Sequence, residues 1–153
     1  MSTVKQQIIL MADDDADDRL LVQDALSECQ FGESVRFVAD GEELLDYLLL
    51  RGKYADAASA PAPGLILLDL NMPRKDGRQA LREIRQHPDW RRTPVVVFTT
   101  SKADTDVRTI YDLGANSFVV KPAAYDALVK IMSQLAEYWF GVVELPPPKL
   151  KNP

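Results

Sequence analysis

The chain has 153 residues, a net charge of −5 and a hydrophobic fraction of 46%. Its length suits one well-buried domain, and its acidic balance argues against a general binder of nucleic acid or anionic membranes. The single cysteine, Cys29, cannot form an internal disulfide, and no stretch approaches the roughly 18 apolar residues of a membrane span. We therefore expect a cytoplasmic protein with one domain over residues 1–145 and a tail containing proline and lysine over 146–153.

Short apolar runs alternate along the chain with segments whose apolar residues have helical spacing. The five runs cover 8–12, 35–39, 65–68, 95–98 and 117–120, and the five predicted helices cover 17–30, a segment from 40, a segment after 77, 104–113 and 123–140. Alternation of this kind predicts a five-stranded parallel sheet with helices on both faces, an α/β fold.

One segment, residues 52–64, interrupts the alternation with the small residues of GKYADAASAPAPG. A loop of about a dozen residues is near the upper end for a compact domain. Its composition favours a mobile surface loop within the domain over a boundary between two domains.

The stretch Leu65–Gly77, LILLDLNMPRKDG, places an acid directly after a buried strand. Four apolar residues bounded by turn formers are typical of a strand buried on both faces, and Pro73 and Gly77 favour a tight loop before the next helix. Open α/β sheets bind their ligands outside the carboxyl ends of their strands. We therefore expect Asp69 to be the centre of the function.

Other strand ends also carry polar groups: Asp13 and Asp14 after the first, Thr99–Ser101 at the fourth and Lys121 at the fifth. The carboxyl ends of parallel strands share one edge, so these groups can converge with Asp69. Three carboxylates in one pocket repel each other, and a divalent cation such as Mg²⁺ relieves that repulsion with few protein ligands. With Lys121 as a further positive charge, the set favours bringing a phosphoryl group to Asp69.

Four segments together resemble the response-regulator receiver domain of two-component signalling. They are ILMADDD at 9–15, LLDLNMPRKDG at 67–77, PVVVFTTS at 94–101 and SFVVKP at 117–122. The resemblance covers essentially the whole chain and implies a flavodoxin-like, CheY-like three-layer sandwich. It also implies a protein that signals through protein–protein contacts and catalyses only its own aspartyl phosphorylation and dephosphorylation.

The resemblance assigns roles to individual residues. Asp69 matches the aspartate that accepts a phosphoryl group from a sensor histidine kinase. Asp13 and Asp14 match the acidic pair that holds Mg²⁺, Asp14 directly and Asp13 through water, and the backbone carbonyl of Asn71 matches a further ligand. An oxygen of Asp69 would attack the phosphorus, with the metal and a lysine neutralising the phosphoryl oxygens.

Further roles concern the response to phosphorylation. Thr99 matches the switch hydroxyl that bonds the phosphoryl group, and Lys121 matches the lysine that pairs with it. Phe118 occupies the position of an aromatic residue that turns inward on activation. Pro122 matches a proline that the family commonly joins through a cis peptide bond.

Within the family, the chain resembles the stand-alone regulators of bacterial phytochrome histidine kinases. The similarity rests on the long loop at 52–64, the Thr-Thr-Ser run and the ending YWFGVVELPPP. The dense apolar residues of that ending predict a homodimer contact. They are Tyr138, Trp139, Phe140, Val142, Val143 and Leu145.

Other interpretations remain open from the sequence. The acids at 13–15 could be only a helix cap, Lys121 plain surface charge, and Phe118 and the terminal aromatics only core. A phosphatase of the haloacid dehalogenase type also uses a strand-end aspartate, but it needs an acid where Asn71 stands. A protein interaction module that is never phosphorylated is a second rival. A transcription factor would need a DNA-binding domain, for which the residues after Phe140 are too few.

Overall fold

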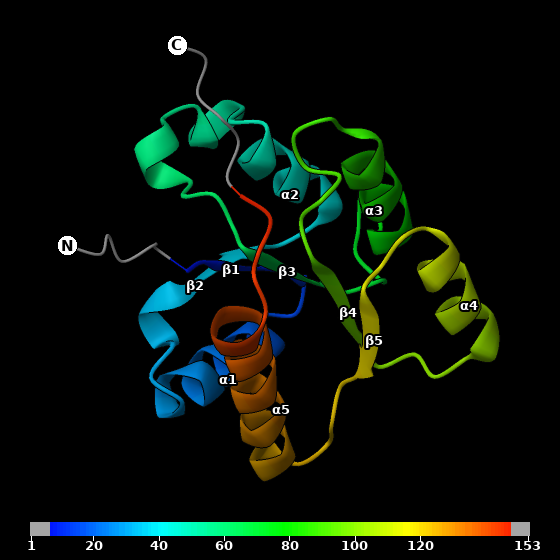
Figure 1. Ribbon diagram of the computed structural model, residues 1–153. Coiled ribbons are helices and arrows are strands. Elements are labelled where there is room, and N and C mark those ends of the chain that lie inside the picture. Colours follow the sequence, from blue (N-terminus) through cyan, green and yellow to red (C-terminus); the bar gives the residue numbers. More distant parts are fainter. Residues whose placement is uncertain (1–6, 148–153) are drawn as a thin grey trace.

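Short, almost wholly apolar strands form the centre of the molecule. The computed structural model describes residues 7–147, and within that range five parallel strands form one sheet in the order β2-β1-β3-β4-β5 (Figure 1). The strands are β1 (Ile9–Ala12), β2 (Val35–Val38), β3 (Leu65–Leu68), β4 (Val95–Thr99) and β5 (Ser117–Val120). The predicted parallel sheet is confirmed.

Helices cover both faces of this sheet, as the alternation predicted. In Figure 1, α1 (Ala16–Glu28) and α5 (Tyr125–Glu137) lie together on one side. The other side carries α2 (Gly41–Leu48), α3 (Gly77–Gln86) and α4 (Asp104–Asp112). The result is the expected α/β sandwich of three layers. None of the helices in the described range is long and apolar enough to cross a membrane.

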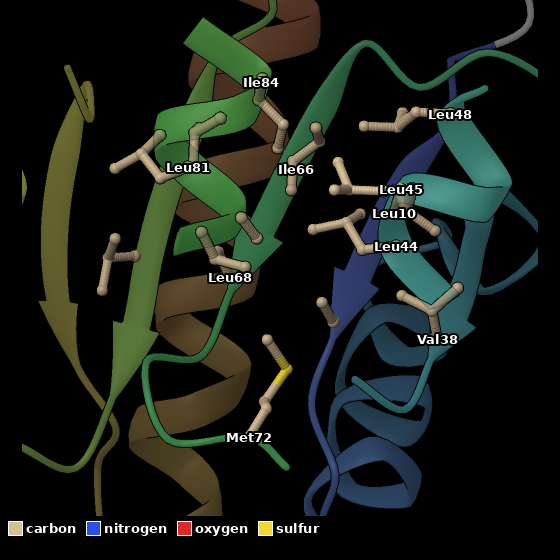
Figure 2. Close-up of a cluster of buried hydrophobic side chains, with 14 of the residues drawn as sticks. Leu10, Val38, Leu44, Leu45, Leu48, Ile66, Leu68, Met72, Leu81 and Ile84 are labelled. Carbon is tan, nitrogen blue, oxygen red and sulfur yellow. The ribbon is translucent and has the colours of Figure 1, made fainter. Parts of the chain in front are cut away.

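Two hydrophobic clusters join the layers. One fills the space between the sheet and α2 and α3, where leucines of α2 face Leu81 and Ile84 of α3 across β1 and β3 (Figure 2). The other joins α1 and α5 to the opposite face through residues such as Leu26 and Met132. Because each fully buried leucine or isoleucine stabilises by about 1.5–3 kcal/mol, these clusters fix the positions of the strand ends.

Aspartates begin the first three helices. The side chain of Asp15 accepts hydrogen bonds from the backbone N–H groups of Asp17 and Asp18, and Asp40 and Asp76 cap α2 and α3 in the same way. Such caps satisfy N–H groups that have no partner within the helix. The helix-cap interpretation of the acids at 13–15 is therefore correct for Asp15.

The loop at 52–64 is more ordered than its composition indicated. It contains two short 3-10 helices, Gly52–Tyr54 and Ala57–Ser59, and Ala60 is buried in the cluster of Figure 2. The Tyr54 hydroxyl donates to Glu43 Oε2 at 2.6 Å, and the Tyr47 hydroxyl donates to the Pro61 carbonyl at 2.6 Å. Most residues of the loop are exposed, as expected of a surface loop, and α2 supplies partners for Tyr54 and Pro61 that composition does not reveal. Its mobility stays a prediction.

The chain after α5 doubles back along the body of the domain. A turn of π-helix, Tyr138–Val142, follows α5, and the ring of Phe140 stacks on Phe31 with centroids 6.0 Å apart. A Cβ placed on Gly64 would lie 2.9 Å from Leu145, so the segment runs close to the start of β3. Of the predicted domain and tail, residues 1–6 and 148–153 lie outside the described range.

Candidate functional site

Register brings two acids to one edge of the sheet. Ala12 of β1 pairs with Leu68 of β3, so the residues that follow, Asp13 and Asp69, lie side by side. Asp13 is fully buried and Asp69 is 7% exposed, whereas Asp14 is exposed. One carboxylate oxygen from each of these three acids lies within 4.8 Å of the others. The predicted convergence of strands one and three is confirmed.

Lys121 reaches the same point from the end of β5. Its backbone N–H donates to the Thr99 carbonyl at 2.7 Å, which holds it beside β4. Its ammonium Nζ lies 2.7 Å from Asp13 Oδ2, 2.8 Å from Asp18 Oδ2 and 3.4 Å from Asp69 Oδ2. The lysine is therefore the counter-ion of the acidic cluster, and the interpretation as plain surface charge is wrong.

Burial and the neighbouring charges shift the pKa values of these groups in opposite directions. Burial raises the pKa of the Asp13 carboxyl, against the lowering effect of Lys121 and of the Asp15 N–H that donates to it. Burial by itself would lower the pKa of Lys121, but its bonds to Asp13 and Asp18 and the charge of Asp69 raise it. The ammonium therefore stays charged, and its charge stabilises acids that the protein has removed from water.

Thr99 contributes a hydroxyl that can still form a hydrogen bond. The residue is fully buried, and within residues 7–147 its Oγ1 has no hydrogen-bond partner. A buried polar atom without a partner costs about 1–3 kcal/mol, so few such atoms occur in folded proteins. This hydroxyl is available to a ligand at the end of β4.

Close backbone contacts fix the loop after Asp69. The Gly77 N–H donates to the Leu70 carbonyl at 2.9 Å, and a Cβ on Gly77 would lie 2.2 Å from the Asp69 carbonyl oxygen. Only glycine fits this approach. Met72 extends from the loop into the cluster of Figure 2, whereas Asn71 is exposed. The backbone carbonyl of Asn71 as a metal ligand stays a prediction.

Two residues of α1, Asp18 and Arg19, also belong to the site, and neither could be assigned to it from the sequence pattern. The Asp18 carboxylate accepts a hydrogen bond from the Lys121 ammonium at 2.8 Å. Arg19 Nη1 donates to the Asp13 carbonyl at 2.7 Å. Their position in the sequence was the one indication that they lie near the site. Both residues are in the first turn of a helix that starts just after the acidic run.

The predicted switch residues lie on the side of the site near α4. Phe118 is half-buried against the cluster of Figure 2, and its N–H donates to the Tyr111 hydroxyl at 3.2 Å. Ser101 donates to Asp106 Oδ2 at 2.6 Å, and Arg78 bonds the other oxygen of that carboxylate. The cis peptide implied at Pro122 is wrong, since every peptide bond of the described chain is trans, the geometry that X–Pro bonds favour.

The arrangement fits a divalent cation next to an anion. Three carboxylates supply the oxygen ligands that hard cations prefer, at an edge where one of them, Asp14, is open to solvent. Lys121 and the Thr99 hydroxyl can bond the oxygens of an anion attached to Asp69. This donor set suits phosphoryl transfer to a carboxylate.

Comparisons with known proteins agree with this chemistry. Residues 9–133 match the model of the family described as response regulator receiver domain. The response regulator Rcp1 of Synechocystis is 38% identical over 140 residues, which cover 92% of this chain and 93% of that protein.

Solved structures show the same similarity. The phosphorylated cyanobacterial phytochrome response regulator RcpA has a TM-score of 0.85 at 39% identity, covering 93% of this chain and 99% of that one. The Mn²⁺-bound form of Rcp1 has a TM-score of 0.80 at 37% identity, covering 92% and 99%. A response regulator in red light signaling of R. palustris has a TM-score of 0.86 at 35% identity, covering 92% and 99%.

The counter-ion role of Lys121 predicts how the protein responds to its loss. We expect Lys121→Met to lower the free energy of unfolding by about 3 kcal/mol in EDTA, because it leaves buried carboxylates without a cation. Added Mg²⁺ should restore more stability to this variant than to the wild type. Urea unfolding with and without Mg²⁺ measures both effects.

Lys130→Met is the matched control, because Lys130 is exposed and makes no ion pair in the described chain. It should unfold like the wild type. Equal stability of the two variants in EDTA would contradict the role given to Lys121.

Proposed function

The chain belongs to the response regulator receiver domain family, and from that membership we propose that Asp69 accepts a phosphoryl group from a sensor histidine kinase. The observation that carries the proposal is the convergence of Asp13, Asp14 and Lys121 on Asp69. The protein is a signalling receiver whose chemistry is its own phosphorylation. Family membership and Asn71 both argue against the phosphatase alternative.

The residues of the site suit an in-line transfer. Asp69 is almost fully buried, and close backbone contacts hold the loop that follows it. One of its carboxylate oxygens can therefore approach the phosphorus in a fixed orientation, at a small cost in entropy. Lys121 neutralises the charge that the phosphoryl group brings, and the unpaired Thr99 hydroxyl donates to one of its oxygens. The bond between phosphorus and the kinase histidine breaks as the bond to Asp69 forms.

The metal in this proposal is Mg²⁺. Asp14 and Asp69 would bind it directly, the Asn71 carbonyl would add a ligand, and Asp13 would act through water. When bound, the ion would neutralise phosphoryl oxygens next to Asp69. The proximity of the three carboxylates and the Mn²⁺-bound form of Rcp1 support a divalent cation here.

The hydrogen bond between the Thr99 hydroxyl and the phosphoryl group starts the signal. A hydroxyl that moves toward the phosphoryl group leaves space behind β4, and Phe118 turns inward to fill it. Ser101 and the Phe118 N–H are bonded to residues of α4, so both movements reach that helix. A two-state shift of this kind changes the surface formed by α4 and β5.

A phytochrome-type histidine kinase is the proposed donor. The support is the similarity to RcpA and Rcp1 over almost their whole length, at 39% and 38% identity. Coverage of 93% of Rcp1 also supports a regulator that acts as a single receiver domain. Within this proposal the transfer takes place in the cytoplasm, in keeping with the single cysteine of the chain.

A homodimer is proposed through the end of α5. Trp139, Phe140 and Leu145 contact their own domain, but Tyr138 is 49% exposed and Val142 is 66% exposed. Beside them, a groove of about 500 Å³ is lined by residues of β5, α5 and the π-helical turn. These exposed apolar side chains and the groove support a contact between two copies.

Intact-mass measurement tests the proposed acceptor. The protein is incubated with a small acyl-phosphate donor, with and without Mg²⁺, beside an Asp69→Asn variant. We expect the mass of one phosphoryl group to be added to the wild type with Mg²⁺ and none to the variant, because Asp69 is the nucleophile. Transfer to the variant, or none to the wild type, would favour the protein interaction module.

Phosphotransfer kinetics test the proposed donor. We expect transfer from a phosphorylated phytochrome kinase to be faster than from unrelated histidine kinases on the order of tenfold or more, since a matched interface lowers the barrier by about 1.4 kcal/mol per tenfold. The link to phytochromes is rejected when the two rates are equal.

Sedimentation equilibrium tests the dimer. Val142→Asp should raise the dimer dissociation constant on the order of tenfold, because it buries a charge in an apolar contact. Leu20→Asp is the control, since Leu20 is 60% exposed on α1. A monomeric wild type, or equal weakening by both variants, contradicts the proposed interface.

A further inference from the structure

Lys121 bonds other acids more closely than it bonds the proposed acceptor. Its Nζ is 2.7 Å from Asp13 and 2.8 Å from Asp18, but 3.4 Å from Asp69, beyond the usual range of an N–H···O bond. The ammonium is therefore held closest to Asp13, at the end of β1, and to Asp18 of α1. It must move toward Asp69 to bond a group attached there.

Asp18 reaches Lys121 from a fixed backbone. Its N–H donates to Oδ1 of the helix cap Asp15 at 3.2 Å, which fixes the first turn of α1. Its side chain is 32% exposed, whereas that of Asp13 is fully buried. Asp18 is thus the carboxylate of this group that water can solvate when Lys121 leaves it.

Two acids hold the ammonium at bonding distance. A lysine has three N–H donors; Asp13 and Asp18 take two of them, and the third faces Asp69 at 3.4 Å. To come within bonding distance of a phosphoryl oxygen on Asp69, the ammonium must move away from Asp13 or from Asp18. Moving away from Asp13 would leave a buried charge without its cation, so moving away from Asp18 has the lower cost.

We propose that Asp18 is a positioning residue that competes with the phosphoryl group for the Lys121 ammonium. Asp18 holds Lys121 in the resting site and sets how strongly the site binds a phosphoryl group. This inference rests on the proposed function, in which that group is attached to Asp69. The Asp18 carboxylate takes no part in the transfer itself.

Beryllofluoride, an analogue of the phosphoryl group, provides the test. It is titrated into the full chain with saturating Mg²⁺ and followed by the fluorine NMR signal of the bound form. We expect Asp18→Asn to lower the half-saturating concentration by about three- to tenfold, because Lys121 no longer has to leave a carboxylate.

Asp17→Asn is the matched control. It removes the same charge from the same helical turn, and within the described chain no ion pair involves the Asp17 carboxylate. Titration with Mg²⁺ alone should give both variants the same small change in affinity. A merely structural role for Asp18 would instead lower thermal stability and leave the beryllofluoride titration unchanged.

The outcomes separate the two hypotheses. No binding of beryllofluoride by the wild type would reject the proposed function. Binding by the wild type with equal effects of Asp17→Asn and Asp18→Asn would reject only the role of Asp18. Weaker binding by Asp18→Asn would show that Asp18 supports Lys121 in this step, and it would also overturn the inference.

Discussion

The ion pairs of Lys121 are the interaction on which this site depends. Asp13 is fully buried and Asp69 nearly so, and two carboxylates so close would repel each other strongly without a cation beside them. The ammonium supplies that charge within the chain itself. The same charge is needed by a phosphoryl group on Asp69, so the group that stabilises the resting site also takes part in its chemistry.

The sheet makes this arrangement possible. The strands β1, β2 and β3 end at paired residues, and so do β4 and β5. The backbone bonds of Asp13 to Val38, Asp69 to Ala12 and Lys121 to Thr99 continue the ladder just past the strands. Residues that are 108 positions apart in the chain thereby meet through side chains. The hydrophobic clusters on both faces hold these ends, which is why a small site can be rigid before any ligand binds.

The sequence was sufficient to predict the sheet, its helices and the meeting of Asp13, Asp69 and Lys121, because strand ends follow from apolar runs and parallel strands share an edge. It was not sufficient for Asp18. Helical spacing places that residue on a polar face, and only the geometry of α1 relative to β5 shows that this face meets Lys121. The loop at 52–64 shows the same limit, since its composition does not reveal that the Tyr54 hydroxyl bonds Glu43 of another element.

A crystal structure with Mg²⁺ and beryllofluoride tests the account most directly. The account predicts beryllofluoride on Asp69, with Lys121 Nζ and Thr99 Oγ1 each about 3 Å from a fluorine. Lys121 would then have given up one of its resting contacts. Beryllofluoride bound elsewhere, or bound to Asp69 with Lys121 and Thr99 unmoved, would contradict the account.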